Sequence, residues 1–535
     1  MDREKYEKLV NTFFKWDQES ILTIFAELLS AASAADAQPG APVMSQNYET
    51  ARENPEINIL PGNLKDARDS IFPFFWGTES WNSPLHLENV RGPANHASLV
   101  GALACLLKNP NLCTDRYSQR SNELELKAVT ALANLTFYHT QDPWGVFTIG
   151  GTISNFYGAK IGLERVLPGT MQNGLANSGS GVIGICSSAS HYSNQTIAGW
   201  IGIGTKQLIK VPTDQHLAMR LDLLEAQIEK AYQDGKLVAY IVATFGSTDG
   251  FGIDDIQAIR EIINRLSSKY SKPAPQLHVD AAVGWALTFL TDYNLTNNDL
   301  KMSQSLLENV AKVQNHCRGL QHADSITIDF HKMGRGHYPS SAFIVNRRED
   351  LKFLARSVSD TPYFAEATAN RDPALFTLEC SRPAIGPYTV MASLDGIGLN
   401  GWRMLVARSL ELAQQLKDRL QQLEFCRVLN YENVGPSVNW WVLPKGRDAN
   451  EIFSRLTEGK LTEADQQRYF KEIRRLYDKR EMTADPARDA KLGFTTDYGF
   501  QPNDIHIPAW KAVFFNPQTD DAIIDRIIFS LEDLV

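Results

Sequence analysis

Residues 325–332 read Ser-Ile-Thr-Ile-Asp-Phe-His-Lys, and residues 277–282 read Leu-His-Val-Asp-Ala-Ala. The first stretch begins with alternating β-branched residues, a pattern typical of a β-strand, and it ends in a lysine, Lys332. The second is an apolar run that also reads as a strand, with Asp280 near its end. Because open α/β sheets bind their ligands at the carboxyl ends of the strands, we expect Lys332 and Asp280 at one edge of a sheet.

A lysine at a strand end, next to an imidazole, is expected to be partly desolvated. Desolvation lowers the pKa of the amine and makes it a nucleophile. A lysine together with a fixed carboxylate is what pyridoxal 5′-phosphate requires, since one forms a Schiff base and the other keeps the pyridine nitrogen protonated. Solvated loop residues at strand ends have the same residue types, so this pair alone leaves both interpretations open.

The composition of the 535-residue chain is that of a soluble globular protein, with 43% hydrophobic and 21% charged residues. A net charge of −9 argues against nucleic acid or an anionic membrane as the main partner. We expect no signal peptide, no membrane span and a cytoplasmic protein. The cysteines have no Cys-x-x-Cys spacing and predict reduced thiols, and no metal site is expected; they are Cys105, Cys113, Cys186, Cys317, Cys380 and Cys426.

The pattern of the chain predicts three parts. Residues 1–94 form an N-terminal helical segment and linker, in which an amphipathic helix over 1–30 is either a surface helix or a docking arm. Residues 95–385 alternate helices and short apolar strands, which predicts an α/β domain with a largely parallel sheet. Residues 386–535 form a smaller C-terminal α+β domain, which begins with a long helix over 388–423.

Two further stretches carry possible site residues. Residues 148–155, Thr-Ile-Gly-Gly-Thr-Ile-Ser-Asn, lead into a helical pattern over 156–167. Glycines, hydroxyls and free amides at a helix N-terminus can bind phosphate, although a Gly-Gly turn precedes many helices. The aromatic stretch 71–82, which includes Thr78, predicts either core packing or a wall of a substrate pocket.

Five short motifs occur in a distinctive order. They are Gly-Gly-Thr-Ile-Ser-Asn (150–155), Ser-His-Tyr-Ser (190–193), Gly-Ser-Thr (246–248), His-Val-Asp-Ala-Ala (278–282) and Asp-Phe-His-Lys (329–332). Each is common alone, but together, in this order and spacing, they resemble the group II pyridoxal-phosphate-dependent amino acid decarboxylases, the family of the glutamate, aromatic amino acid and tyrosine decarboxylases. The resemblance covers about 95–385, with looser similarity up to the C-terminus.

The resemblance implies a fold-type I enzyme, with a mostly parallel seven-stranded sheet domain and a smaller C-terminal domain. It also implies a homodimer with shared active sites, which binds pyridoxal 5′-phosphate and a small amino acid. By position, Lys332 is the Schiff-base lysine, Asp280 pairs with the pyridine nitrogen, and His191 stacks on the ring. The remaining cofactor-binding residues implied by the resemblance are Thr152, Ser154, Thr248, Ala282 and His331.

The implied reaction is decarboxylation of an L-amino acid to CO2 and a primary amine, followed by protonation at Cα. Tyr338, Tyr363 and His191 are the candidate proton donors. Lys511 stands where the family has an arginine for the substrate carboxylate, although lysine lacks the planar fork of arginine. Arg335 and His337 favour an acidic substrate such as aspartate or glutamate, whereas the aromatic stretch 72–76 favours a tyrosine-like one, and the sequence leaves both open.

Three alternative functions remain open on the same scaffold: a carbon–carbon lyase, a decarboxylating aldehyde synthase, and a catalytically silent dimer. Retention of Tyr338 and Tyr363 argues against the aldehyde synthase. The joint presence of Lys332, Asp280 and His191 argues against the silent dimer.

Overall fold

The computed structural model describes residues 3–14, 18–36, 48–53, 59–75, 81–136, 138, 142–175, 181–356 and 372–535. The chain forms two compact units, Met1–Trp81 and Asn82–Val535. The first unit ends earlier than the predicted segment 1–94. The reason is Leu87, which is fully buried and whose backbone bonds to Lys491 and Val513, far along the chain.

In its described residues, the N-terminal unit has four α-helices and a short 3-10 helix. They are α1 (Arg3–Phe13), α2 (Gln18–Asp36), α3 (Tyr48–Glu53), α4 (Leu64–Ile71) and η1 (Phe72–Phe75). The predicted helix over 1–30 is therefore two helices, and α2 continues into the predicted flexible link at 31–43. The alanines of 31–36 explain this extension, because alanine is the strongest helix former. Thr78 lies outside the described residues.

A seven-stranded sheet organises the second unit, with the order β1-β7-β6-β5-β4-β2-β3. The pairings β2–β3, β2–β4, β4–β5 and β5–β6 are parallel, and β7 is antiparallel to both of its neighbours, as expected for a mostly parallel sheet. The strands are β1 (Trp144–Thr148), β2 (Val182–Ser187), β3 (Leu208–Val211), β4 (Leu237–Thr244), β5 (Gln276–Asp280), β6 (Ser325–Asp329) and β7 (Ser341–Val345).

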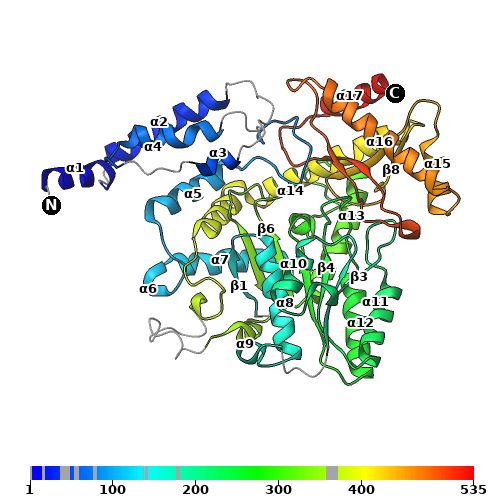
Figure 1. Cartoon of the computed structure of the whole chain (residues 1–535), viewed down its shortest axis with the longest axis horizontal. Helices are drawn as coiled ribbons and strands as arrows, with labels where there is room; N and C mark the ends of the chain where they lie inside the picture. Colours follow the sequence, from blue (N-terminus) through cyan, green and yellow to red (C-terminus); the bar gives the residue numbers. More distant parts are fainter. Residues whose placement is uncertain are drawn as a thin grey trace. The chain divides into compact units, whose positions relative to one another are not determined.

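Helices cover both faces of this sheet, which explains why its strands read as nearly continuous apolar runs. Along β4, Ile241 and Ala243 belong to the main core cluster, whereas Tyr240 and Val242 belong to a second cluster on the other face. Of the helices on the main-core face, α11 and α12 lie side by side (Figure 1). The helices of this part are α5 (His96–Lys108), α6 (Asp115–Ser118), α7 (Ser121–Leu135), α8 (Gly151–Val166), α9 (Thr170–Asn173), α10 (Ser193–Trp200), α11 (Leu221–Gln233), α12 (Ile256–Lys269) and α13 (Gln304–Arg318).

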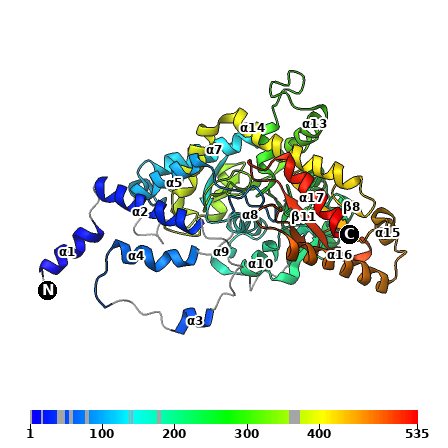
Figure 2. The same cartoon turned by 90° about the horizontal axis from the view of Figure 1, so that it is seen from above.

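A long helix, α14 (Ile385–Gln421), runs from the large sheet to the C-terminal part (Figures 1 and 2). It packs on α5 and α7 near its start and on β8 (Cys426–Val428) and α17 (Asp521–Leu534) near its end. Gly398 interrupts it with a φ of 70°, a left-handed conformation that glycine adopts without steric cost. Within the described ranges, no helix combines the length and the apolar character needed to cross a membrane.

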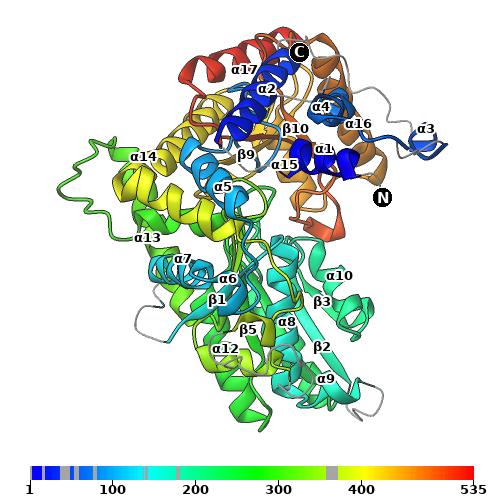
Figure 3. The ribbon, with the colours of Figure 1, turned by 90° about the vertical axis from the view of Figure 1, so that its left-hand side faces the viewer.

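The C-terminal part is built on a four-stranded antiparallel sheet of order β10-β11-β9-β8, shown together with α16 and α17 in Figure 3. Its other elements are β9 (Ser437–Val442), β10 (Gly493–Thr495), β11 (Ala509–Val513), α15 (Ala449–Thr457) and α16 (Glu463–Thr483). The charged segment 456–490 is mostly the single helix α16. This helix buries Tyr469, Ile473 and Leu476 against the sheet, so it contributes to the small core.

Candidate active site

The carboxyl ends of the central strands form the walls of one cavity. Lys332 and Asp280 both line it, as do four of the other predicted residues. Its lining is Gly151, Thr152, Asn155, His191, Ser193, Thr244, Gly246, Ser247, Thr248, Asp280, Ala282, Val283, Asp329 and Lys332. Its free volume is about 80 Å³, so the assignment rests on the set of side chains rather than on the size of the cavity.

The Lys332 amine forms an ion pair inside this cavity. Its Nζ lies 3.1 Å from Oδ2 of Asp329, which is buried and also accepts a 2.6 Å hydrogen bond from Ser341. Burial lowers the pKa of Lys332, but the carboxylates of Asp329 and Asp280 outweigh it and hold this pKa above its ordinary value. The prediction of a lowered pKa for Lys332 is therefore wrong, because the amine forms an ion pair with Asp329.

Asp280 at the end of β5 is held by two hydrogen bonds. Its Oδ1 accepts from the amide of Ala282 at 3.1 Å, and its Oδ2 accepts from Nδ2 of Asn155 at 2.8 Å. Oδ1 of Asn155 in turn accepts from the hydroxyl of Thr327 at 2.6 Å and lies 3.0 Å from Nε2 of His278. Asn155 thus fixes the carboxylate, a role that only its place at the end of motif 150–155 could have suggested.

Truncation of Asn155 should loosen this carboxylate. Asn155→Ala leaves Oδ2 of Asp280 without its hydrogen bond, and an unsatisfied buried group costs about 1–3 kcal/mol. We expect the dissociation constant for pyridoxal 5′-phosphate, measured by equilibrium dialysis, to rise by about tenfold. Asn309→Ala on α13, which does not line the cavity, serves as the control. Equal cofactor affinity in the two variants would contradict this role of Asn155.

His278 links the cavity to the stability of the sheet. It is fully buried, and burial lowers its pKa to about 4 from an unfolded value near 6.5. Below pH 6.5 the His278 side chain is protonated in the unfolded chain, but in the folded chain it stays neutral down to about pH 4. The free energy of unfolding should therefore be highest above pH 6.5 and fall between pH 6.5 and pH 4, by roughly 3 kcal/mol from this residue.

Urea unfolding at pH 7.5, 6 and 5 measures this dependence. His278→Asn should unfold more easily at pH 7.5 but lose less stability on acidification than the parent chain. His331, whose pKa burial also lowers to about 4, remains as a second source of acid sensitivity in this variant. An unchanged acid slope in His278→Asn would show that His278 is protonated in the folded state.

His191 lies before α10 and lines the cavity, as predicted. Its Nδ1 is 2.8 Å from the hydroxyl of Ser193, which fixes the plane of the ring. Burial lowers the pKa of His191, and the cation of Lys332 lowers it further, so the neutral imidazole is favoured. A neutral, oriented ring is suited to stacking on a planar ligand.

The N-terminus of α8 supplies a candidate phosphate site. The helix starts at Gly151, earlier than the predicted 156, and has no side-chain cap, so its first amides are open to an anion beside Thr152. The buried Thr244 hydroxyl also lines the cavity and has no hydrogen-bond partner within the described chain. Ser154 does not line the cavity, because its hydroxyl lies 2.8 Å from that of Thr148.

The remaining predicted residues differ in their positions. Thr248 lines the cavity, whereas Lys511 on β11 does not, since its amine lies 2.9 Å from Asp249. Arg335 is buried and donates to the carbonyls of Phe515 and Met333. This contradicts its predicted contact with substrate, because the guanidinium is hydrogen-bonded to backbone carbonyls in the protein interior.

His331 and Tyr338 stack on each other with their ring centroids 3.9 Å apart, and neither lines the cavity. His331 is buried, with its Nε2 3.6 Å from Asp329, so it acts on the cavity through that carboxylate. Tyr338 is 54% exposed, so its hydroxyl is accessible to solvent or to a partner. Tyr363, the other candidate tyrosine, lies outside the described residues.

Fold and cavity together define a class. An amine and a carboxylate in one cavity, an open helix N-terminus and a neutral imidazole are the set that pyridoxal 5′-phosphate needs for its aldehyde, ring nitrogen, phosphate and ring face. Residues 44–442 match the model of the pyridoxal-dependent decarboxylase conserved domain. The chain belongs to this family, and pyridoxal 5′-phosphate is its cofactor.

Individual relatives agree with this assignment. The chain is 30% identical over 283 residues to L-2,4-diaminobutyrate decarboxylase of Acinetobacter baumannii, covering 51% of this chain and 50% of that protein. It is 24% identical over 373 residues to the acidic amino acid decarboxylase GADL1 of Homo sapiens, covering 69% and 66%. The chain thus spans between half and two thirds of the length of these relatives.

The fold also matches solved structures. The crystal structure of mouse CSAD in apo form superposes with a TM-score of 0.77 at 18% identity, covering 97% of this chain and 99% of that one. Similarity at this level of identity bears on the fold alone. It confirms the predicted fold-type I architecture with a smaller C-terminal domain.

Proposed function

We propose that this protein is a pyridoxal 5′-phosphate-dependent L-amino acid decarboxylase that releases CO2 and a primary amine. The observation that carries the proposal is the shared cavity of Lys332, Asp280 and His191 at the carboxyl edge of the sheet. Family membership supports the reaction class.

Each residue has a distinct task in this proposal. The amine of Lys332 would hold the cofactor covalently. Asp280, fixed by Asn155, keeps a proton on the ring nitrogen through its negative charge. His191 covers one ring face and Ala282 the other, while Thr152 and the first amides of α8 hold the phosphate. When bound, the cofactor accepts the electron pair that CO2 leaves behind.

A proton must then reach Cα. The candidates are Tyr338, Tyr363 and His191, as the sequence predicted. The exposed position of Tyr338 and its contact with His331 favour a role for this tyrosine at the mouth of the site. Tyr338→Phe removes only the hydroxyl, so comparison of kcat in the variant and the parent tests it directly.

The substrate is proposed as an acidic or a tyrosine-like amino acid. The name of the human relative supports the acidic class, while that of the Acinetobacter relative adds 2,4-diaminobutyrate to the candidates. Arg335 no longer contributes to this choice, because its guanidinium faces the interior. Lys511 stays the predicted partner of the substrate carboxylate, and Asp249 holds its amine next to Thr248.

We also propose a cytoplasmic homodimer. Large apolar side chains are exposed next to the cavity in sequence, at Ile149 before Gly151 and at Tyr192 after His191. Further exposed apolar residues lie on α5, at Leu99, Leu106 and Leu107. Covering these side chains in a dimer would bury apolar surface and close the cavity. Analytical ultracentrifugation of the full chain tests this.

The proposed activity is tested with a panel of the twenty amino acids and 2,4-diaminobutyrate, with CO2, ammonia and peroxide measured in parallel. CO2 and amine without ammonia or peroxide support a decarboxylase. Ammonia and peroxide indicate the aldehyde synthase, cleavage without CO2 indicates a carbon–carbon lyase, and no reaction with any substrate indicates a silent scaffold.

A further inference from the structure

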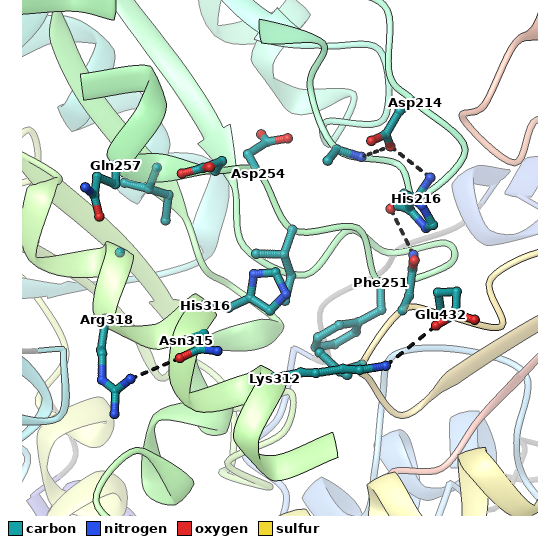
Figure 4. A pocket seen from close by; sticks show the side chains of 17 residues that line it. Asp214, His216, Phe251, Asp254, Gln257, Lys312, Asn315, His316, Arg318 and Glu432 are labelled. Atoms are coloured by element: carbon teal, nitrogen blue, oxygen red, sulfur yellow. Dashed lines mark hydrogen bonds and ion pairs between the residues drawn. The ribbon is translucent and has the colours of Figure 1, made fainter. Parts of the chain in front are cut away.

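A second cavity, of about 600 Å³, lies apart from the site described above (Figure 4). It lies between the end of α13, the start of α12, the loop around Asp214 and the segment 432–434 of the C-terminal part. It shares no lining residue with the cofactor cavity. Its volume is within the range of small-molecule sites, about 300–1,000 Å³.

One wall carries cations with spare hydrogen-bond donors. Lys312, His316 and Arg318 lie on the last two turns of α13, and the ring of His316 points into the cavity in Figure 4. Arg318 donates from Nη1 to Asn315 at 3.0 Å. Within the described chain its other nitrogens and the exposed His316 ring have no hydrogen-bond partner. Lys312 lies 3.6 Å from Glu432, which closes one side.

The lining also carries two carboxylates, Asp214 and Asp255, that are oriented by backbone amides. Oδ1 of Asp214 accepts from the amides of His216 and Ala218, and Oδ1 of Asp255 accepts from that of Ala258. In both residues Oδ2 has no partner within the described chain. These backbone bonds hold the two carboxylates in place, as in a preformed site.

We propose that this cavity binds a free α-amino acid, with its carboxylate on Arg318 and His316 and its ammonium on Asp214 and Asp255. An ion of one sign would be attracted by one set of these side chains and repelled by the other, whereas a zwitterion satisfies both. Phe251 contributes an apolar surface to the same cavity.

The second cavity connects to the first through Asp254, which lines it. Both oxygens of this buried carboxylate accept backbone bonds, from Thr244 at 2.7 Å and from Met219 at 2.6 Å. Thr244 lines the cofactor cavity. A bound amino acid that displaces Asp254 therefore moves the end of β4, where the cofactor is held.

A second connection runs through the turn after β4. Phe251 has a φ of 57°, a strained value for an aromatic residue, and this kind of strain is typical of functional turns. The preceding Gly250 carbonyl accepts from Nδ2 of Asn433, another lining residue, at 2.8 Å. The same turn carries Thr248 into the cofactor cavity, so contact with Asn433 or Phe251 reaches both sites.

Calorimetric titration of the twenty amino acids into the cofactor-loaded full chain tests the site. We expect at least one to bind, and Arg318→Ala to weaken this binding by about tenfold through loss of a charge-assisted bond. Arg455→Ala, at an exposed arginine in the last turn of α15, is the matched control and should change binding by less than twofold. An amino acid bound in the cofactor cavity would be unaffected by Arg318→Ala.

Three outcomes would overturn the proposal: no binding by any amino acid, equal binding in Arg318→Ala and the parent, or tighter binding of methylamine or inorganic phosphate than of any amino acid. The connection has its own readout, the rate at which the cofactor is lost to a scavenger. We expect the bound amino acid to change this rate by threefold or more in the parent and not in Arg318→Ala. An equal rate with and without the amino acid would remove the connection. The binding test is independent of the proposed decarboxylation, so either can fail alone.

Discussion

Lys332→Ala is expected to lower kcat by about 10³-fold or more, within the range for loss of a group that takes part directly in the chemistry. Lys332 is the only lysine that lines the cavity in the described chain, and Asp280 lines the same cavity. Decarboxylation should be measured with the substrate found by the amino acid panel. The yellow absorbance of the purified protein should also be lost.

A second variant separates chemistry from folding. Lys332→Ala leaves Asp329 buried without its cation, and breaking a buried pair costs about 3–5 kcal/mol, so this variant is expected to be less stable. Lys332→Arg keeps a cation beside Asp329 but cannot form the covalent link to the cofactor that an amine forms. We expect it to keep more of the thermal stability and none of the turnover. Normal kcat in Lys332→Arg would refute the assignment.

Asp280→Asn should lower kcat by about 10²- to 10³-fold, because about 3–5 kcal/mol is lost when one partner of a buried charge pair is removed. The amide has the same size but only one acceptor oxygen, so it keeps the hydrogen bond from Ala282 or the one from Asn155 while the charge is removed. The proton on the ring nitrogen then loses its counter-charge, and the ring becomes a poorer electron acceptor.

The absorbance spectrum and the cofactor affinity of Asp280→Asn distinguish this effect from simple loss of the cofactor. We expect kcat to fall much more than the occupancy of the cofactor at saturating concentration. Asp525→Asn on α17, at a carboxylate that pairs with Arg419 and does not line the cavity, is the control and should keep most of the turnover. A kcat in Asp280→Asn within threefold of the parent would place the ring nitrogen elsewhere.

Much of the fold could be predicted from local sequence. The strands β5 and β6 match the run 277–282 and the start of the run 325–332 to within about two residues, because both faces of the sheet are buried and each strand must be apolar along its length. The cavity at the carboxyl edge follows from the same topology. The predicted helix over 156–167 is shorter than α8, which begins at Gly151. The Gly150-Gly151 pair is typical of a turn, but only Gly150 lies outside the helix.

The sequence by itself determined the family, because five motifs occur in the order typical of it. It also determined that Lys332, Asp280 and His191 lie at one edge of the sheet, because each follows an apolar run that forms a strand. Only the tertiary structure decided the partner of each side chain. Asp329 forms an ion pair with the Lys332 amine, and Asn155 donates a hydrogen bond to Asp280. Asp249 pairs with Lys511, which is 262 positions away in the sequence. Such pairings arise when distant segments pack together, and they set charge and pKa, so spacing along the chain does not reveal them.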